Sequence, residues 1–251
     1  MSIEENNRWI EEVLKDKHVV LFGYADLSDI DLALRHNLPY AICIAIRVEV
    51  MPSLTDIPIM EFHDFYYYSN RYLNMLSFIL VDAIKERGYN ARLVGGEGFN
   101  KVNETTPLPY KTLATRAGLG WIGKSAVLVT KEFGPAVRLA GVLTDMPVKT
   151  GTPINASLCG GCMECTSHCP GKAISGKLWN VTSAREDFYD YEACRSAIAE
   201  RGKAINVTNG ACGICVGICP HTKRTWTPPE PQDRIPILPA DPNNPHMPLL
   251  K

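Results

Sequence analysis

The sequence predicts an α/β domain followed by a smaller, cysteine-rich, metal-binding domain. Three observations support this prediction. Apolar runs of strand length alternate with helical patterns over the first 150 residues. Eight of the nine cysteines lie between Cys159 and Cys219, and the last 24 residues hold eight of the eighteen prolines. We therefore predict an α/β domain at 1–152, a cysteine domain at 153–225 and an extended proline-rich tail at 226–251.

Charge and composition exclude several classes of protein. A formal net charge of −1 gives no overall basic field for nucleic acid or an anionic membrane. The first twelve residues are acidic and amphipathic, unlike an export signal, and no apolar run approaches the ~18 residues of a membrane span. Nine cysteines without an export signal predict a cytoplasmic protein with reduced thiols. In that compartment closely spaced cysteines bind metal more often than they form disulfides.

The first elements follow from periodicity. Residues 6–17 have the pattern of an amphipathic helix, and Ser2 and Glu5 just upstream have capping-box spacing. Residues 18–24 and 40–48 are β-branched and aliphatic runs of strand length. The polar stretch between them can form a short helix, which predicts a βαβ rhythm.

The longest helical pattern covers residues 61–87, with Gly88 as a stop. We interpret its apolar stripe as core packing, with these members: Phe62, Phe65, Tyr72, Leu76, Ile79, Leu80 and Ala83. Further elements are predicted as a strand at 91–94, a helix at 110–117, and strands at 126–130 and 137–143. Cys43 stands apart from the other cysteines in an apolar run, which favours a small buried hydrophobe.

The first cysteine motif comprises Cys159, Cys162, Cys165 and Cys169, followed by Pro170. Its C-x2-C-x2-C-x3-C-P spacing is typical of bacterial ferredoxins with two 4Fe-4S clusters. Three thiolates two residues apart can surround one cubane, while the turn at the proline carries the fourth thiolate away. The fourth cysteine is therefore predicted to serve the other cluster.

A second motif has the form C-x2-C-x3-C-P and consists of Cys212, Cys215 and Cys219 before Pro220. It lacks one cysteine, which Cys194 can supply. Exchange of the last cysteine of each motif predicts two sets: Cys159, Cys162, Cys165 and Cys219 for cluster one, and Cys169, Cys194, Cys212 and Cys215 for cluster two. Paired zinc knuckles are the alternative, although they need no shared ligand after a Cys-Pro.

The segment 118–125, GLGWIGKS, satisfies the phosphate-loop pattern G-x4-G-K-[ST]. A phosphate loop needs a strand before it and a helix after it, and here the predicted order is reversed. The glycines still indicate a sharp turn or a closely approaching group. Trp121 is either a core residue or a flat face for a large planar ligand, and the sequence leaves both open.

The run RAGLGWIGKS at 116–125, followed by a strand and by the two cysteine motifs in this order, resembles epoxyqueuosine reductase. That family consists of cobalamin and double 4Fe-4S enzymes of tRNA queuosine synthesis, related in architecture to reductive dehalogenases. The resemblance covers roughly residues 61–220. It implies an α+β, nitroreductase-like N-terminal domain that holds a corrinoid against a ferredoxin-like domain, with electrons passing from the clusters to cobalt.

The resemblance also implies site residues. The corrinoid-side loop would contain Gly118, Gly120, Trp121, Gly123, Lys124 and Ser125. The family has a catalytic Asp three residues before a proline, and Glu104, three residues before Pro107, resembles its counterpart. Glu104 would act as a general acid if burial raises its pKa toward neutrality.

The chain departs from the family in three ways: Glu replaces Asp, residues 90–106 match poorly, and a proline-rich tail stands where the tRNA enzyme has helical repeats. With a net charge of −1, these departures favour a small-molecule substrate over tRNA. The resulting prediction is a cytoplasmic corrinoid-dependent reductase served by a low-potential donor of the ferredoxin or flavodoxin type. The alternatives are a 4Fe-4S electron-transfer protein without substrate chemistry, and a flavin-dependent reductase.

Overall fold

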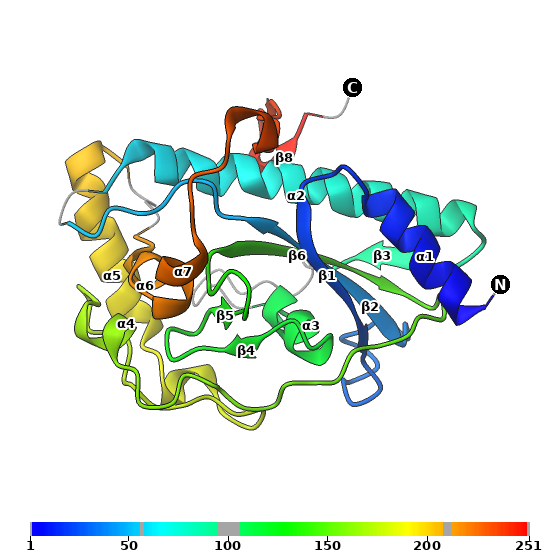
Figure 1. Ribbon diagram of the computed structural model, residues 1–251, viewed down its shortest axis with the longest axis horizontal. Coiled ribbons are helices and arrows are strands. Elements are labelled where there is room, and N and C mark those ends of the chain that lie inside the picture. Colours follow the sequence, from blue (N-terminus) through cyan, green and yellow to red (C-terminus); the bar gives the residue numbers. More distant parts are fainter. Residues whose placement is uncertain (1, 56–57, 95–105, 208–211, 250–251) are drawn as a thin grey trace.

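The computed structural model describes residues 2–55, 58–94, 106–207 and 212–249. Its centre is a four-stranded sheet with the strand order β1-β2-β6-β3, formed by β1 (Val19–Asp26), β2 (Tyr40–Arg47), β6 (Val137–Thr144) and β3 (Ala91–Leu93). The helices α1 (Ile3–Leu14) and α2 (Met60–Glu86) lie on one side of this sheet, and α3 (Tyr110–Arg116) lies on the other (Figure 1).

All neighbouring strands of the sheet are antiparallel. The βαβ rhythm predicted at the start of the chain is therefore wrong, because such a unit would make its two strands parallel. The stretch between β1 and β2 forms turns instead of a helix. The carboxylates of Asp26 and Asp31 each accept a hydrogen bond of 2.8 Å from the backbone two residues on, at Ser28 and Ala33. Such local bonds compete with helix formation.

The helices on the first face follow the predicted pattern closely. The capping box at the start of α1 is confirmed, with reciprocal bonds between Ser2 and Glu5. The helix α2 buries most of the predicted stripe, including Phe65, Leu76 and Leu80. Ile79 is an exception, because it lies at the solvent side of the stripe with 37 % of its surface exposed.

The strand β2 is buried on both faces. Ile42, Ile44 and Ile46 point into the layer of α1 and α2, whereas Ala41 and Cys43 belong to the cluster around α3. The prediction that Cys43 is a buried apolar residue is confirmed, since none of its surface is exposed. Burial raises the pKa of its thiol to about 12, so it stays neutral.

A short hairpin follows α3 on the second face. It consists of β4 (Trp121–Ile122) and β5 (Leu128–Val129), which pair antiparallel. The strand predicted at 126–130 is thus present, although it is shorter. The order of a helix before the GLGWIGKS segment and a strand after it is confirmed.

The described part of the cysteine region contains four helices, which lie at one end of the molecule, while the hairpin lies between them and α3 (Figure 1). They are α4 (Glu164–Ser167), α5 (Tyr191–Gly202), α6 (Ile214–Gly217) and α7 (Pro220–Thr225), and the 3-10 turns η1 (Arg185–Asp187) and η2 (Lys203–Ile205) adjoin α5. The fold as a whole is a mixed α/β structure with this region toward its C-terminal part.

The proline-rich segment ends in a turn η3 (Pro231–Asp233) and a hairpin of β7 (Ala240–Asp241) and β8 (Asn244–Pro248). This hairpin lies along the outer side of α2 (Figure 1). Arg71 and Asn74 of α2 donate hydrogen bonds of 2.7 Å to the carbonyl oxygens of Leu238 and His246. In the described ranges, no helix combines the length and the apolar character that crossing a membrane requires.

Leu80→Ala tests the core of α2, with Ile79→Ala as its matched neighbour. Leu80 is fully buried, so its truncation is expected to lower the free energy of unfolding by about 2–5 kcal/mol through lost burial and a cavity. The partly exposed Ile79 should change it by no more than about 0.5 kcal/mol. Urea unfolding followed by circular dichroism measures both, and equal losses would contradict the assigned faces.

Candidate metal centre

The first cysteine motif lies on a loop and on α4. Cys159 and Cys162 are joined by a turn in which the Cys162 N–H donates to the Cys159 carbonyl at 3.2 Å. Cys165 lies within α4, and Cys169 follows it before Pro170. A second turn then runs from the Lys172 N–H to the Cys169 carbonyl at 3.0 Å. The chain therefore turns directly after Cys169, and Cys169 is not among the thiols that raise the pKa of Cys165.

The second motif is built on two short helices. Cys215 lies in α6 and Cys212 just before it, whereas Cys219 is the N-cap of α7, with Pro220 as the first helical residue. Proline suits that position because its missing N–H would have no helical partner. Cys194 comes from the longer helix α5.

The thiols that raise one another's pKa fall into two sets with the same members as the predicted exchange, while the assignment of a cluster to each set stays a prediction. We call Cys159, Cys162, Cys165 and Cys219 the first group, and Cys169, Cys194, Cys212 and Cys215 the second group. Burial raises the pKa of Cys165 to about 11, and the nearby thiols that add to this rise are all of the first group. Two thiols of the first group raise the pKa of Cys219, whereas two thiols of the second group raise the pKa of Cys194. The pKa of Cys215 is raised by the other three members of its group and also by Cys165, so the two groups adjoin.

The donor set fits two iron–sulfur cubanes. Seven of the eight thiols are partly buried and Cys162 is exposed. Thiols collected in this way resist ionisation, so four thiolates in one place need the positive charge of bound metal. Among the described residues, no three His, Cys, Asp or Glu side chains converge on a point where one ion would touch them all. In a cubane, iron and sulfide lie between the thiolates, so its four thiolates are farther apart than the ligands of a single ion.

The GLGWIGKS segment packs against the first group. The Trp121 indole has only 2 % of its surface exposed, and its N–H donates to the Cys159 Sγ at 3.4 Å. Lys124 is also buried, and its Nζ donates to the Cys162 carbonyl at 2.8 Å. Of the two alternatives that the sequence left open for Trp121, the structure favours a core residue. No helix follows the segment, so the geometry of a phosphate loop is absent from this described stretch.

The glycines of this segment face the protein's own chain. Gly118 has a φ of +74°, and a Cβ at this position would lie 2.8 Å from the Thr152 carbonyl oxygen. A Cβ at Gly120 would clash with the Val129 carbonyl of the hairpin. At Gly123 it would lie 2.8 Å from the Val129 Cγ2 and 3.6 Å from the Cys159 Sγ. These close approaches account for the three glycines, while the role of the loop toward a corrinoid stays a prediction.

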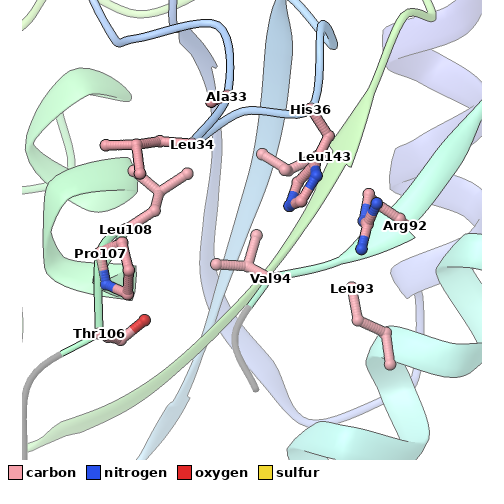
Figure 2. A pocket seen from close by; sticks show the side chains of 10 residues that line it. All are labelled: Ala33, Leu34, His36, Arg92, Leu93, Val94, Thr106, Pro107, Leu108 and Leu143. Atoms are coloured by element: carbon pink, nitrogen blue, oxygen red, sulfur yellow. The ribbon is translucent and has the colours of Figure 1, made fainter. Parts of the chain in front are cut away.

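The predicted acid, Glu104, lies outside the described residues. Thr106 and Pro107, which follow it, line a cavity of about 210 Å³ at the end of β3 (Figure 2). Figure 2 shows the imidazole of His36 and the guanidinium of Arg92 on one side of this cavity and apolar side chains such as Leu108 on the other.

A second cavity, of about 280 Å³, lies between α3 and the segment that precedes α5. Three cationic side chains line it: Lys111, Arg116 and Arg185. Burial, assisted by the charge of Arg185, lowers the pKa of Lys111 to about 8. Arg116 forms an ion pair with Asp29 at 2.5 Å.

Sequence reasoning missed two residues beside the second group. The Tyr189 hydroxyl opposes part of the rise that burial causes in the pKa of Cys194. Arg201 is 8 % exposed, and its charge opposes part of the rise that burial causes in the pKa of Cys212. The Nε and Nη2 of Arg201 have no hydrogen-bond partner among the described residues. Neither residue has a fixed spacing from its cysteine that a motif would reveal.

Residues 158–222 match the family model described as a 4Fe-4S double cluster binding domain. This match covers both cysteine motifs and Cys194. Together with the two groups of thiols, it defines a protein of the double-cluster iron–sulfur class, and it favours cubanes over zinc knuckles.

The resemblance to epoxyqueuosine reductases is confirmed by the known proteins. The chain is 39 % identical over 125 residues to the epoxyqueuosine reductase of Atelocyanobacterium thalassa, which covers 48 % of this chain and 40 % of that protein. It is 35 % identical over 121 residues to the tetrachloroethene reductive dehalogenase of Sulfurospirillum multivorans, which covers 44 % of this chain and 23 % of that protein. The chain thus spans less than half the length of these relatives, both of which are reductases.

The fold is also similar to that of a solved structure. An epoxyqueuosine reductase in complex with an epoxyqueuosine-modified tRNA-Tyr stem loop superimposes with a TM-score of 0.60 at 19 % identity. The similarity covers 92 % of this chain and 69 % of that one. At this identity the comparison shows the fold alone.

Proposed function

We propose that this protein is a reductase that passes electrons through two 4Fe-4S clusters to a bound corrinoid. The observation that carries the proposal is the match of residues 158–222 to a double-cluster domain, and the two sets of thiols that raise one another's pKa support it. The chain's relatives among epoxyqueuosine reductases and a reductive dehalogenase support a reductase rather than a passive carrier.

The first group would hold one cluster and the second group the other. Each group draws on both motifs, so neither cluster can form unless the two motifs are folded against each other. The influence of Cys165 on the pKa of Cys215 indicates that the two groups are neighbours, which supports a short electron path from one cluster to the other. The hairpin of β4 and β5 shields the first group from solvent on one side through Trp121.

A corrinoid, when bound, would supply the two-electron reducing chemistry that the clusters lack. The proposal gives the 118–125 segment the place beside it, with Gly118, Gly120 and Gly123 holding a sharply turned backbone. Glu104 would deliver a proton to the substrate as a general acid. The motif order shared with the reductases supports the place of the segment, and the spacing of Glu104 from Pro107 supports its role.

The proposed substrate is a small molecule, and the proposed donor is a low-potential protein of the ferredoxin or flavodoxin type. The structure of a relative contains a modified tRNA stem loop. An RNA substrate is therefore the alternative to a small molecule. The net charge of −1 supports the small molecule, because phosphate binding depends on clustered Lys and Arg.

Protein purified without oxygen is expected to contain about eight iron and eight acid-labile sulfide per chain, because each cubane has four of each. Iron and sulfide assays with zinc analysis measure this content. Stoichiometric zinc without sulfide would overturn the cluster assignment.

Cys169→Ala and Cys219→Ala should each damage the cluster opposite to the one that their own motif mainly builds. Cys169→Ala removes a ligand of the second group, and Cys219→Ala removes one of the first, which electron paramagnetic resonance can separate. Cys43→Ser is the control: both clusters should remain, at a stability cost of about 1–3 kcal/mol for an unpaired buried hydroxyl. The Tyr110 carbonyl oxygen lies 4.0 Å from the Cys43 Sγ, which is beyond the distance of a hydroxyl hydrogen bond. Loss of the same cluster in both alanine variants would contradict the exchange.

Reconstituted protein incubated with hydroxocobalamin is expected to retain about one corrinoid per chain after gel filtration, with cobalt bands in the visible spectrum. Glu104→Gln should retain both corrinoid and clusters, because the proposal gives this residue a proton to deliver and no cofactor to hold. Retention of a flavin instead would identify a flavin-dependent reductase, and retention of neither would identify an electron carrier.

A further inference from the structure

We propose that Lys124 and Trp121 set the reduction potential of the cluster held by the first group. The GLGWIGKS segment would thereby act as a redox-tuning element that the α/β part of the chain extends to the cysteine region. This inference rests on the proposed function, since it requires the clusters, but not on the corrinoid or on any substrate.

Lys124 brings a buried positive charge to the first group. Its side chain is 4 % exposed, and its Nζ lies 2.8 Å from the Cys162 carbonyl oxygen and 3.5 Å from the Met163 Sδ. No Asp or Glu of the described residues forms an ion pair with this ammonium. A buried charge that is not neutralised by a carboxylate acts through a low dielectric on whatever lies next to it. Here the neighbour is the loop that carries Cys159 and Cys162.

Trp121 adds a hydrogen bond to a sulfur of the same group. The indole is 2 % exposed, and its only donor, Nε1–H, is directed at the Cys159 Sγ at 3.4 Å. The ring is also held edge-on by His221, with ring centroids 5.3 Å apart. Hydrogen bonds to the sulfurs, net charge and solvent exposure are the levers by which proteins set cluster potentials. The segment 121–124 supplies a hydrogen bond to a sulfur and a positive charge, and it limits the exposure to solvent.

The hairpin holds both side chains in place. Trp121 pairs with Val129 across β4 and β5. The turn is closed by hydrogen bonds of 2.9 Å from the Gly123 N–H to the Val127 carbonyl and from the Ala126 N–H to the Gly123 carbonyl. Because Gly123 has no Cβ, this turn can approach Cys159 closely. A Cβ at position 123 would collide with the Val129 side chain. The pattern that resembles a phosphate loop is therefore accounted for by a tight hairpin that directs a lysine at a cysteine loop.

Reduction of the cluster is a one-electron step in which the donor loses the electron that the cubane gains. The cubane passes from its 2+ to its 1+ core while all four thiolates stay bound, so its negative charge increases by one. A fixed positive charge and a fixed N–H dipole stabilise the more negative state and therefore raise the potential. Neither effect requires a proton to be taken up.

The second group offers an internal comparison, because different residues adjoin it. Tyr189 and Arg201 stand beside Cys194 and Cys212, whereas Lys124 and Trp121 contact the loop of the first group. Changes at Lys124 or Trp121 should therefore move one potential and leave the other unchanged.

The test uses the full-length, cluster-loaded protein and redox titration followed by electron paramagnetic resonance. Lys124→Met removes the charge with little change in length, and at a fixed ambient potential it should lower the ratio of reduced to oxidised first cluster about tenfold. For one electron, that corresponds to a midpoint lower by about 59 mV. Trp121→Phe keeps a ring and removes the N–H, and it should shift the same cluster in the same direction. The second cluster should keep its midpoint in both variants.

Lys111→Met is the matched control. Lys111 is another enclosed lysine whose Nζ donates to a backbone carbonyl, that of Ala126 at 3.0 Å, and the cavity that it lines has no cysteine among its described residues. It should leave both midpoints unchanged. Arg201→Met should move only the second cluster, which identifies the two signals.

Three results would overturn the inference: unchanged midpoints in both Lys124→Met and Trp121→Phe, equal shifts of both clusters, or the same shift in Lys111→Met. Loss of the first cluster from both test variants would also overturn it, because it would show a structural role alone. Iron and sulfide analysis of the unaltered protein separates these results from failure of the proposed function, in which no cubane would be present to titrate.

Discussion

Burial of the strand β2 on both faces is the constraint on which the rest of the structure depends. Its isoleucines hold α1 and α2 on one side, and Ala41 and Cys43 make room for α3 on the other. The helix α3 leads directly into the β4–β5 hairpin, which contacts the first group of thiols through Trp121 and Lys124. An apolar strand in the middle of the sheet thus positions side chains at the edge of the candidate metal centre.

The cysteine region depends on side chains of the α/β part that pack against it. Its helices are short, and seven of its eight thiols in the two groups are only partly buried, so it has a small apolar core of its own. The α/β part contributes Trp121 and Lys124 to the first group, while Phe62 and Pro52 pack closely against Gly213 beside the second. Metal would supply most of the remaining stability, as in other small domains whose folding is coupled to metal binding.

Several elements could be predicted because their signals are local. The capping box of α1, the length of α2 and the burial of Cys43 follow from spacing, periodicity and an apolar run. Sheet direction could not be predicted, because strand-length runs do not encode whether neighbours are parallel. Here side-chain bonds at Asp26 and Asp31 replaced the expected helix by turns, and β1 and β2 became antiparallel neighbours. Ile79 was placed on the wrong side because it lies at the edge of the helical stripe.

The candidate site likewise has features that the sequence predicted and features that only the tertiary structure decided. The sequence by itself predicted the eight cysteines and the exchange between their motifs, because the spacing before each Cys-Pro is typical of double-cluster domains, and residues 158–222 match such a domain. Only the tertiary structure decided what surrounds them. Lys124 and Trp121 lie more than thirty residues before the cysteines they contact, as their hydrogen bonds to Cys162 and Cys159 span 38 residues of chain. Contacts at such separation depend on how the hairpin packs, and no spacing rule within the sequence specifies that packing.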